Sequence, residues 1–253
     1  MFRGIHNKDR AIDEVVNQII ENIQSGELKR GETLPAERTM AQIMGVSRPV
    51  VREALRSLEF LGVIKTVRGG KNYVSENLED CLVGPLSILF RLSHGSIHQA
   101  QQLRSALERK AAFLAAQNCT PLDAAELHLI IAKLDAAQDE KTRGDLDRDF
   151  HAKIGKIAGN PMIFSVMDAS AQITESIISG IRGYMMQKNH SAAEVDDQHR
   201  MLVEAIAGHR EQEAQQYMEE HMKTIEKYIH IACRMITVTQ VGLEIGITTR
   251  KNV

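Results

Sequence analysis

The fold of this chain is decided by residues 34–70, which have the sequence LPAERTMAQIMGVSRPVVREALRSLEFLGVIKTVRGG. Pro35 is a favourable start for a short helix over residues 36–44, and Gly45 allows the tight turn that ends it. Ser47 is a natural N-cap for a further helix, whose apolar residues recur at helical spacing: Val51, Ala54, Leu55, Leu58 and Leu61. The stretch therefore predicts two helices joined by a tight turn.

Short extended runs and a glycine hairpin complete this part of the chain. Residues 63–67 and 72–75 favour strands, and the segment RGGK between them carries two cations. An amphipathic helix over residues 10–25 precedes the quoted stretch. The order of helix, helix, turn, helix and basic hairpin predicts a winged helix-turn-helix, whose third helix enters the major groove of DNA.

The formal net charge of -2 hides an uneven distribution of charge along the chain. Residues 1–75 contain 12 Lys and Arg against 9 Asp and Glu, whereas the rest contains 19 against 24. Residues 38–71 combine two acidic residues with seven basic ones: Arg38, Arg48, Arg52, Arg56, Lys65, Arg68 and Lys71. Such a basic segment indicates a phosphate-rich partner, and the alternative from charge alone is a solvated surface.

Three arginines lie along the predicted third helix. Arg48, Arg52 and Arg56 recur every four residues, so they share an exposed face beside the apolar stripe. The planar guanidinium can donate paired hydrogen bonds to guanine or hold phosphates. We therefore expect this face to contact double-stranded DNA, although Arg56 lies deeper along the helix and has the alternative of pairing with Glu53 or Glu59.

After a polar linker at residues 75–80, helical periodicity dominates the sequence. Proline, glycine and polar breaks separate the predicted helices, which cover residues 81–92, 97–118, 121–138, 142–158, 161–187, 192–207 and 210–234. We expect a mainly α protein with two domains, a winged helix-turn-helix over residues 1–77 and an all-α bundle of about seven helices over residues 78–253. Packing on a partner subunit and disorder are both open for the tail after about residue 236.

Composition narrows the class of protein further. The chain has 253 residues, of which 43% are hydrophobic, 25% charged and 4% aromatic, as in a soluble helical protein. No run of 18 apolar residues and no signal peptide is present, which predicts a cytoplasmic location without a membrane partner. Cys81, Cys119 and Cys233 are far apart, which argues against a disulfide framework or a thiolate zinc site and favours buried, reduced thiols.

Three histidines and one aspartate form the best candidate ligand site in the C-terminal part. Asp147 and His151 are four residues apart on one predicted helix, so their side chains share a face. His199 and His221 lie among inward-facing apolar residues of two later helices. Buried together, these groups suit a divalent transition metal, because burying them unpaired would be costly. From spacing alone, a chance pairing of Asp147 with His151 is the alternative.

Residues 34–70 closely resemble the signature of GntR-type transcription regulators. The resemblance implies that the chain binds operator DNA through its winged helix-turn-helix. It also implies which residues occupy the family's DNA-contacting positions: Arg38, Ser47, Arg48, Pro49, Arg52, Arg68 and Gly69.

Two later segments resemble the C-terminal FCD domain of the FadR-like branch of this family, DLDRDFHAKIGKIAGNP at residues 145–161 and DQHRMLVEAIAGHREQEAQQYMEEHM at residues 197–222. In the metal-binding members of that branch, the four ligand positions match Asp147, His151, His199 and His221. The resemblance thus implies a bound divalent transition metal ion, zinc first, with nickel, manganese or iron as alternatives. Regulators that bind acyl-CoA lack this ligand set, which points away from acyl-CoA as the effector.

An early helix of the same domain is matched by residues 101–118, QQLRSALERKAAFLAAQN. In this match Arg104 corresponds to an arginine that faces the effector cavity, and the alternative for Arg104 is an exposed pairing with Glu108. A metal ion beside such an arginine would suit a small carboxylate effector.

The sequence therefore predicts a homodimeric transcription repressor whose affinity for operator DNA is controlled by a small carboxylate bound at a metal site. One alternative is a regulator that responds to the metal alone. The other is a metalloenzyme using the Asp/His3 site, but no general base beside the four ligands and no Ser-His-Asp, P-loop or dinucleotide motif is visible. We therefore expect the chain not to be an enzyme.

Overall fold

The computed structural model describes the backbone of residues 11–67, 71–77, 81–187 and 192–248, and within these the side chains up to residue 174 and over residues 193–231. By internal contacts the chain divides into two compact units between Leu89 and Phe90. This division falls inside helix α4 (Val83–Leu92), a few residues after the predicted linker at residues 75–80. Each unit is described here by itself.

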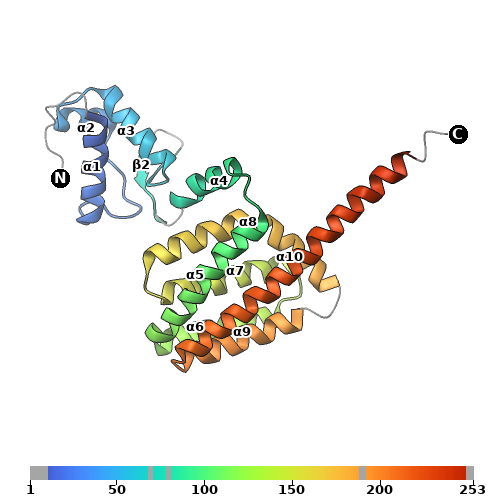
Figure 1. The fold of residues 1–253 in the computed structure, drawn as a ribbon. Helices are drawn as coiled ribbons and strands as arrows, with labels where there is room; N and C mark the ends of the chain where they lie inside the picture. Colours follow the sequence, from blue (N-terminus) through green and yellow to red (C-terminus); the bar gives the residue numbers. More distant parts are fainter. Residues whose placement is uncertain (1–10, 68–70, 78–80, 188–191, 249–253) are drawn as a thin grey trace. The chain divides into compact units, whose positions relative to one another are not determined.

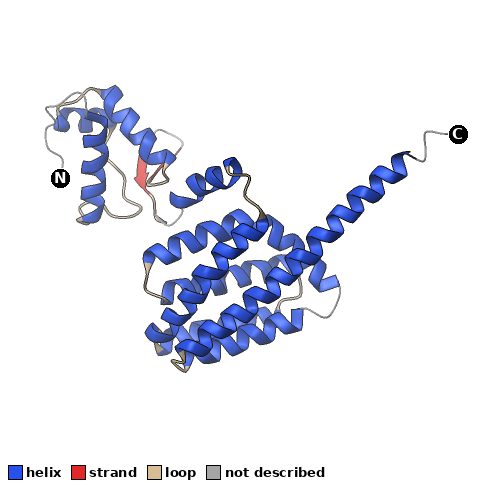
Figure 2. Ribbon diagram, viewed as in Figure 1, coloured by secondary structure: helices blue, strands red, loops and turns tan. Residues whose placement is uncertain are grey.

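The N-terminal unit is the predicted winged helix-turn-helix (Figures 1 and 2). Its elements are α1 (Ala11–Gln24), α2 (Glu37–Met44), α3 (Arg48–Phe60), β1 (Ile64–Val67) and β2 (Lys71–Val74). Gly45 ends α2 in the left-handed region with φ 69°, a conformation that glycine adopts without steric cost. Ser47 is the N-cap residue of α3 as predicted, but its side chain makes no cap hydrogen bond.

The wing is a two-stranded antiparallel sheet. Ile64 pairs with Val74 at one end and Val67 with Lys71 at the other. Thr33, in the loop before α2, bridges to Tyr73 and so ties that loop to β2. Buried side chains from the helices and both strands form one core beneath the wing, which consists of Val15, Ile19, Leu28, Leu34, Met40, Ala41, Met44, Val51, Ala54, Leu55, Leu58, Ile64 and Val74.

The C-terminal unit is a helical bundle, as predicted. After α4 its helices are α5 (Ile97–Asn118), α6 (Pro121–Ala136), α7 (Glu140–Ile157), α8 (Pro161–Gln187), α9 (Ala192–Ala207) and α10 (Glu211–Thr248). Capping boxes begin α5 at Ser96 with Gln99 and α6 at Thr120 with Asp123, which satisfies backbone N–H groups of the first turns. The last helix continues well beyond the predicted end at residue 234, and no proline interrupts it there.

Helix α5 is the central element of the bundle, because it packs against α7, α8, α9 and α10 (Figure 1). Four fully buried alanines on α5 permit this close approach, Ala111, Ala112, Ala115 and Ala116. Larger side chains from the surrounding helices fill the core, among them Phe150, Leu127, Leu202 and Ile206, each fully buried. The core is therefore built around a thin central helix.

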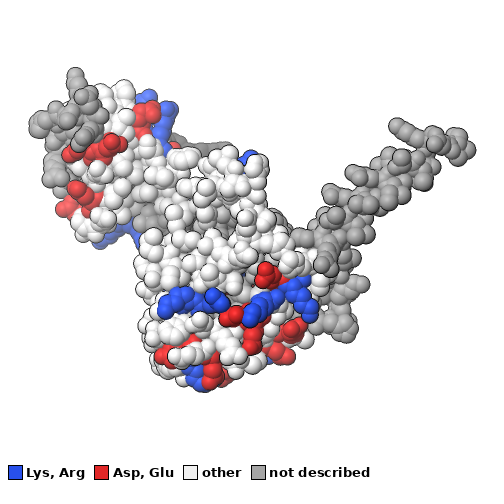
Figure 3. All heavy atoms as spheres, viewed as in Figure 1, with Lys and Arg blue, Asp and Glu red and all other residues white. Residues whose placement is uncertain are grey.

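Several exposed charges on the bundle lie in pairs of opposite sign. Figure 3 shows Lys and Arg side chains next to Asp and Glu side chains on the visible face of the bundle. The Nη1 atom of Arg109 lies 3.1 Å from Glu219 Oε2, and Lys223 Nζ lies 2.8 Å from Glu219 Oε1. Exposed pairs of this kind contribute little stability, so the bundle depends on its core.

No helix in the described part of the chain combines the length and the apolar character that a membrane crossing requires. The side chain of Cys119 is buried and that of Cys81 is half-buried. The side chain of Cys233 lies outside the described residues.

Two leucines of α6 offer a matched test of this core. Leu127 is fully buried, whereas Leu129 on the same helix is 54% exposed. We expect Leu127→Ala to lower the free energy of unfolding by about 2–5 kcal/mol, because it leaves a cavity, and Leu129→Ala to change it by about 0.5 kcal/mol or less. Urea unfolding followed by circular dichroism measures both, and equal effects would contradict the packing described.

Candidate metal centre and nucleic-acid interface

The structure brings together all four side chains of the predicted ligand set. Asp147 and His151 lie one turn apart on α7, His199 lies on α9, and His221 lies on α10. The ring centroids are 5.7 Å apart for His151 and His199, 5.2 Å for His151 and His221, and 4.6 Å for His199 and His221. One nitrogen from each of the three imidazoles lies within 4.8 Å of the other two. We call Asp147, His151, His199 and His221 the inner cluster.

Asp147 lies at the edge of the three imidazoles. Its Oδ1 atom is 3.5 Å from His199 Nε2 and 3.9 Å from His151 Nε2, and its side chain is 16% exposed. Phe150, fully buried on the same helix, packs its ring at 4.7 Å from the ring of His199 and 5.4 Å from that of His151. The core thus positions α7 so that its carboxylate and imidazole face the ligands from α9 and α10.

Four imidazole nitrogens of the inner cluster are buried without hydrogen-bond partners among the described residues. This holds for Nε2 of His151, both ring nitrogens of His199, and Nδ1 of His221. Burial lowers the pKa of His199 to about 4, although the nearby Asp147 acts in the opposite direction. Burial likewise lowers the pKa of His221 well below its ordinary value. Both rings are therefore neutral at pH 7 and present lone pairs.

The donor set of the inner cluster fits a divalent transition metal. Neutral imidazole nitrogens and one carboxylate are ligands that zinc, nickel and iron accept. Buried polar atoms without partners are rare in folded proteins and call for an explanation, and a bound cation is one that satisfies several of them at once. The residues present are thus chemically suited to the ion that the sequence predicts.

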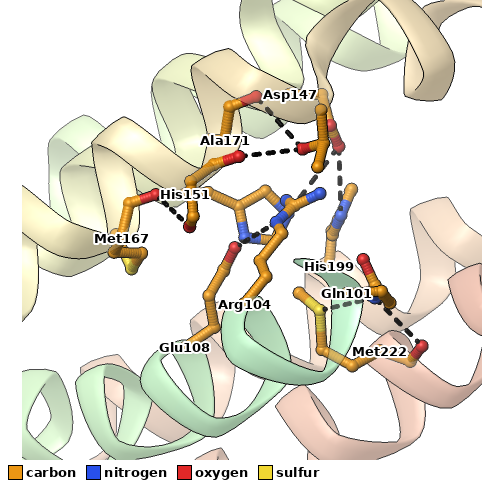
Figure 4. Close-up of polar contacts among 11 residues, drawn as sticks. Gln101, Arg104, Glu108, Asp147, His151, Met167, Ala171, His199 and Met222 are labelled. Carbon is orange, nitrogen blue, oxygen red and sulfur yellow. Dashed lines mark hydrogen bonds and ion pairs between the residues drawn. The ribbon is translucent and has the colours of Figure 1, made fainter. Parts of the chain in front are cut away.

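A buried carboxylate, that of Glu108 on α5, contacts His151 of the inner cluster (Figure 4). It hydrogen-bonds His151 Nδ1 and accepts from Arg104 Nε at 2.6 Å. Burial alone would raise the pKa of Glu108, but its interactions with His151 and Arg104 outweigh this and lower the pKa to about 2. With Nδ1 held by Glu108, the Nε2 atom of His151 is directed to the centre of the cluster.

The alternative considered for Arg104, an exposed pairing with Glu108, does not match the burial of the two residues. The two residues do pair, but Arg104 is 5% exposed and Glu108 1% exposed, so an exposed pairing is wrong. The role of Glu108 beside His151 was not predicted, because 43 residues separate the two in the chain. The sequence does contain one signal for a role of Glu108. This carboxylate follows Arg104 by four residues in the alanine-rich segment RSALERKAA, so the two side chains share one face of the helix.

The predicted DNA-contacting residues on α3 and the turn before it are exposed. Ser47, Arg48, Pro49 and Arg52 lie at or near the start of α3, and Arg38 lies in the first turn of α2. Arg68 and Gly69 of the wing lie outside the described residues.

Glu37, at the start of α2, approaches two of these arginines. Its Oε2 atom lies 3.3 Å from Nη2 of Arg52 and 3.9 Å from Nη2 of Arg48. Arg56 pairs with Glu53 at 3.1 Å, which is one of the two pairings considered for it.

The fold and the site together define a class of protein: a transcription regulator with an N-terminal winged helix-turn-helix and a C-terminal helical domain. Residues 11–74 match the model of the bacterial regulatory proteins of the gntR family, and residues 99–224 match that of the FCD domain. This chain belongs to the GntR family, in the branch that carries an FCD domain.

Known relatives support this membership. The chain is 31% identical over 227 residues to the HTH-type transcriptional repressor NanR of Escherichia coli K12, covering 87% of this chain and 83% of that protein. It is 27% identical to the Glc operon transcriptional activator of the same strain, covering 87% and 90%. Among solved structures, Streptococcus agalactiae GntR shares the fold with a TM-score of 0.67 at 23% identity, covering 85% and 99%. These relatives are regulators, and this chain is a transcription regulator and not an enzyme.

The contact between Glu108 and His151 generates a prediction about metal affinity. Glu108→Gln keeps the shape of the side chain but removes the charge that orients His151, so we expect zinc affinity to fall about 10–100-fold. Competition of the purified protein with a chromophoric chelator measures this. Glu213→Gln, an exposed carboxylate paired with Arg210, is the matched control and should leave zinc affinity unchanged. An unaltered affinity in Glu108→Gln would contradict the positioning role.

Proposed function

We propose that this chain is a homodimeric repressor that binds operator DNA through α3 and the wing, and that a metal ion and a small carboxylate at the inner cluster control its DNA affinity. The observation that carries the proposal is the meeting of three buried imidazoles, each of which has at least one ring nitrogen without a hydrogen-bond partner among the described residues. These imidazoles belong to the C-terminal unit of a chain whose N-terminal unit is a DNA-binding fold.

Recognition of DNA is assigned to the exposed start of α3. Arg48 and Arg52 present guanidinium groups there, with side chains 58% and 47% exposed. Their contacts with Glu37 are exposed and long, so they contribute little and compete weakly with a phosphate or a guanine. Five further residues complete the proposed interface: Arg38, Ser47, Pro49, Arg68 and Gly69.

The cofactor of the proposed function is a divalent transition metal, with zinc the first candidate and nickel, manganese or iron as alternatives. Asp147, His151, His199 and His221 would hold it, and an ion with six positions would keep two for water or the oxygens of a chelating acid. Glu108 fixes His151, and Phe150 keeps water away from the rings of His151 and His199.

A small hydroxy-, keto- or dicarboxylate is the proposed effector. Arg104 brings a buried positive charge to the same region of the bundle (Figure 4). A guanidinium has five N–H donors, so its bond to Glu108 is compatible with contact to a remote carboxylate of the effector. The effector would change DNA affinity by favouring one separation of the two DNA-binding units in the dimer, since half-site spacing is geometric.

The sign of regulation rests on one comparison. Repression is proposed because NanR, the more similar of the two named relatives, is a repressor, whereas the Glc operon protein is an activator. A regulator that responds to the metal alone is the second candidate, and it draws on the same inner cluster.

The proposed recognition helix can be tested on a duplex that the protein selects from random-sequence DNA. Arg48→Ala and Arg52→Ala should each weaken binding by about 1–3 kcal/mol if the arginines contact bases. Fluorescence anisotropy at fixed salt measures the affinities. Arg210→Ala removes an exposed arginine directly before α10 that pairs with Glu213, and this variant is the matched control. Unchanged binding by both α3 variants would refute the assignment.

Control by metal and acid can be tested on the same duplex. We expect zinc-loaded protein to change its DNA affinity when a member of a panel of small hydroxy-, keto- and dicarboxylates is added, because metal and acid act at one site. Chelator-treated protein and the variant His199→Gln should not respond, whereas His128→Gln, an exposed histidine of α6, should respond as the wild type does.

Two results would change the proposal. If zinc alone altered DNA affinity fully and no acid added to the effect, the chain would be a metal-responsive regulator. If neither zinc nor any acid altered DNA affinity while zinc remained bound, control through the inner cluster would be refuted.

A further inference from the structure

A second group of metal-ligand side chains lies outside the inner cluster. His98 is in the first turn of α5, and Glu226 and His230 are one turn apart on α10. One donor atom from each of the three lies within 4.8 Å of the other two. His98 and Glu226 are half-buried and His230 is exposed. We call these three residues the outer cluster.

Apolar packing between α5 and α10 brings the outer cluster together. Ile225 and Ile229 of α10 are buried, and Ile97 at the start of α5 packs against them. Glu226 and His230 each follow one of these isoleucines, so both lie on the adjacent face of α10. His98 follows Ile97 and meets them there. The three donors are therefore positioned by a small core of their own.

The polar atoms of the outer cluster are poorly satisfied by the protein. The Nδ1 atom of His98 is buried and has no hydrogen-bond partner among the described residues. The rings of His98 and His230 lie with centroids 4.1 Å apart and planes tilted by 30°. In the described part of the chain no ion pair to Glu226 is found, and the nearby Lys223 pairs with Glu219 at 2.8 Å instead.

We propose that His98, Glu226 and His230 form a second binding site for a divalent transition metal ion of the zinc type. Two imidazoles and one carboxylate are an established three-ligand set for such ions, with water completing the coordination. All three residues lie outside residues 99–224, the part of the chain that matches the FCD domain. The outer cluster shares no residue with the inner cluster, and the proposal does not depend on the proposed function.

An ion at the outer cluster would join the first turn of α5 to α10. Along α10, Glu226 and His230 follow His221 by five and nine residues, which corresponds to about 7–14 Å at 1.5 Å per residue. The ion would thus hold the two helices together at a point beyond the inner cluster, shortly before the last segment of α10, which continues to Thr248. Its role would be that of a clamp between helices.

Counting bound ions in full-length protein tests this proposal. After chelator treatment and zinc titration, native mass spectrometry and calorimetry should find two zinc ions per wild-type chain and one in His230→Gln or in Glu226→Gln. His199→Gln should also retain one ion, at the outer cluster, and the double variant His199→Gln/His230→Gln should bind none. His128→Gln, outside both clusters, is the matched control and should bind two.

Hydrogen exchange locates the ion independently of the count. In His199→Gln, zinc should slow exchange in residues 97–101 and 226–231, and this protection should be lost when Glu226→Gln is added. Glu226→Gln preserves shape, so it keeps the test decisive if His230→Gln fails to fold.

The proposal is overturned if His199→Gln binds no ion, or if both His230→Gln and Glu226→Gln bind as many ions as the wild type. A different result would show that the inner cluster binds no ion: His199→Gln would then bind as many ions as the wild type.

Discussion

The buried carboxylate of Glu108 is the interaction on which the C-terminal unit depends. A carboxylate that is 1% exposed is costly to bury, and it remains charged because Arg104 and His151 both contact it. These contacts tie α5, the central helix, to α7. They also fix which nitrogen of His151 points inward, because Nδ1 is engaged by Glu108. Removing one partner of such a buried pair costs about 3–5 kcal/mol, because it leaves a buried charge unpaired. The inner cluster is therefore positioned by a charged contact within the bundle and by the core around Phe150.

The helices and strands of the N-terminal unit are determined by signals close to them in the sequence, so the sequence predicts this unit almost completely. Gly45 ends α2 and Ser47 directly precedes α3, whose apolar residues Val51, Ala54, Leu55 and Leu58 form its buried face. Such signals act within a few residues, so no knowledge of distant contacts is needed. The helices of the bundle are predicted for the same reason, within a few residues at most ends. The end of α10 is the exception, since residues 235–248 contain two glycines and no regular helical stripe, and yet the helix continues to Thr248.

The inner cluster is predicted only in part by local pattern. Asp147 and His151 lie one turn apart, so their shared face is evident from spacing, whereas His199 and His221 join them through helix packing that spacing does not encode. The resemblance to the FCD domain supplied that long-range information. It did not supply Glu108, whose importance arises from contacts that form only when α5 packs against α7. Nor did it supply the outer cluster, which lies outside the matched residues.

The inner and outer clusters differ in their access to water, and this access decides what a bound ion can do. The three imidazoles of the inner cluster are 1–4% exposed, so an ion there would exchange its ligands only through the interior of the bundle. A small acid that reached it would lie among buried, charged side chains, where electrostatic contacts are strong. At the outer cluster His230 is exposed, and an ion there would keep water on its open side. The first environment suits discrimination between ligands, and the second suits a link between helices. Because α5 and α10 contribute residues to both environments, a change in how these two helices pack would be felt at both.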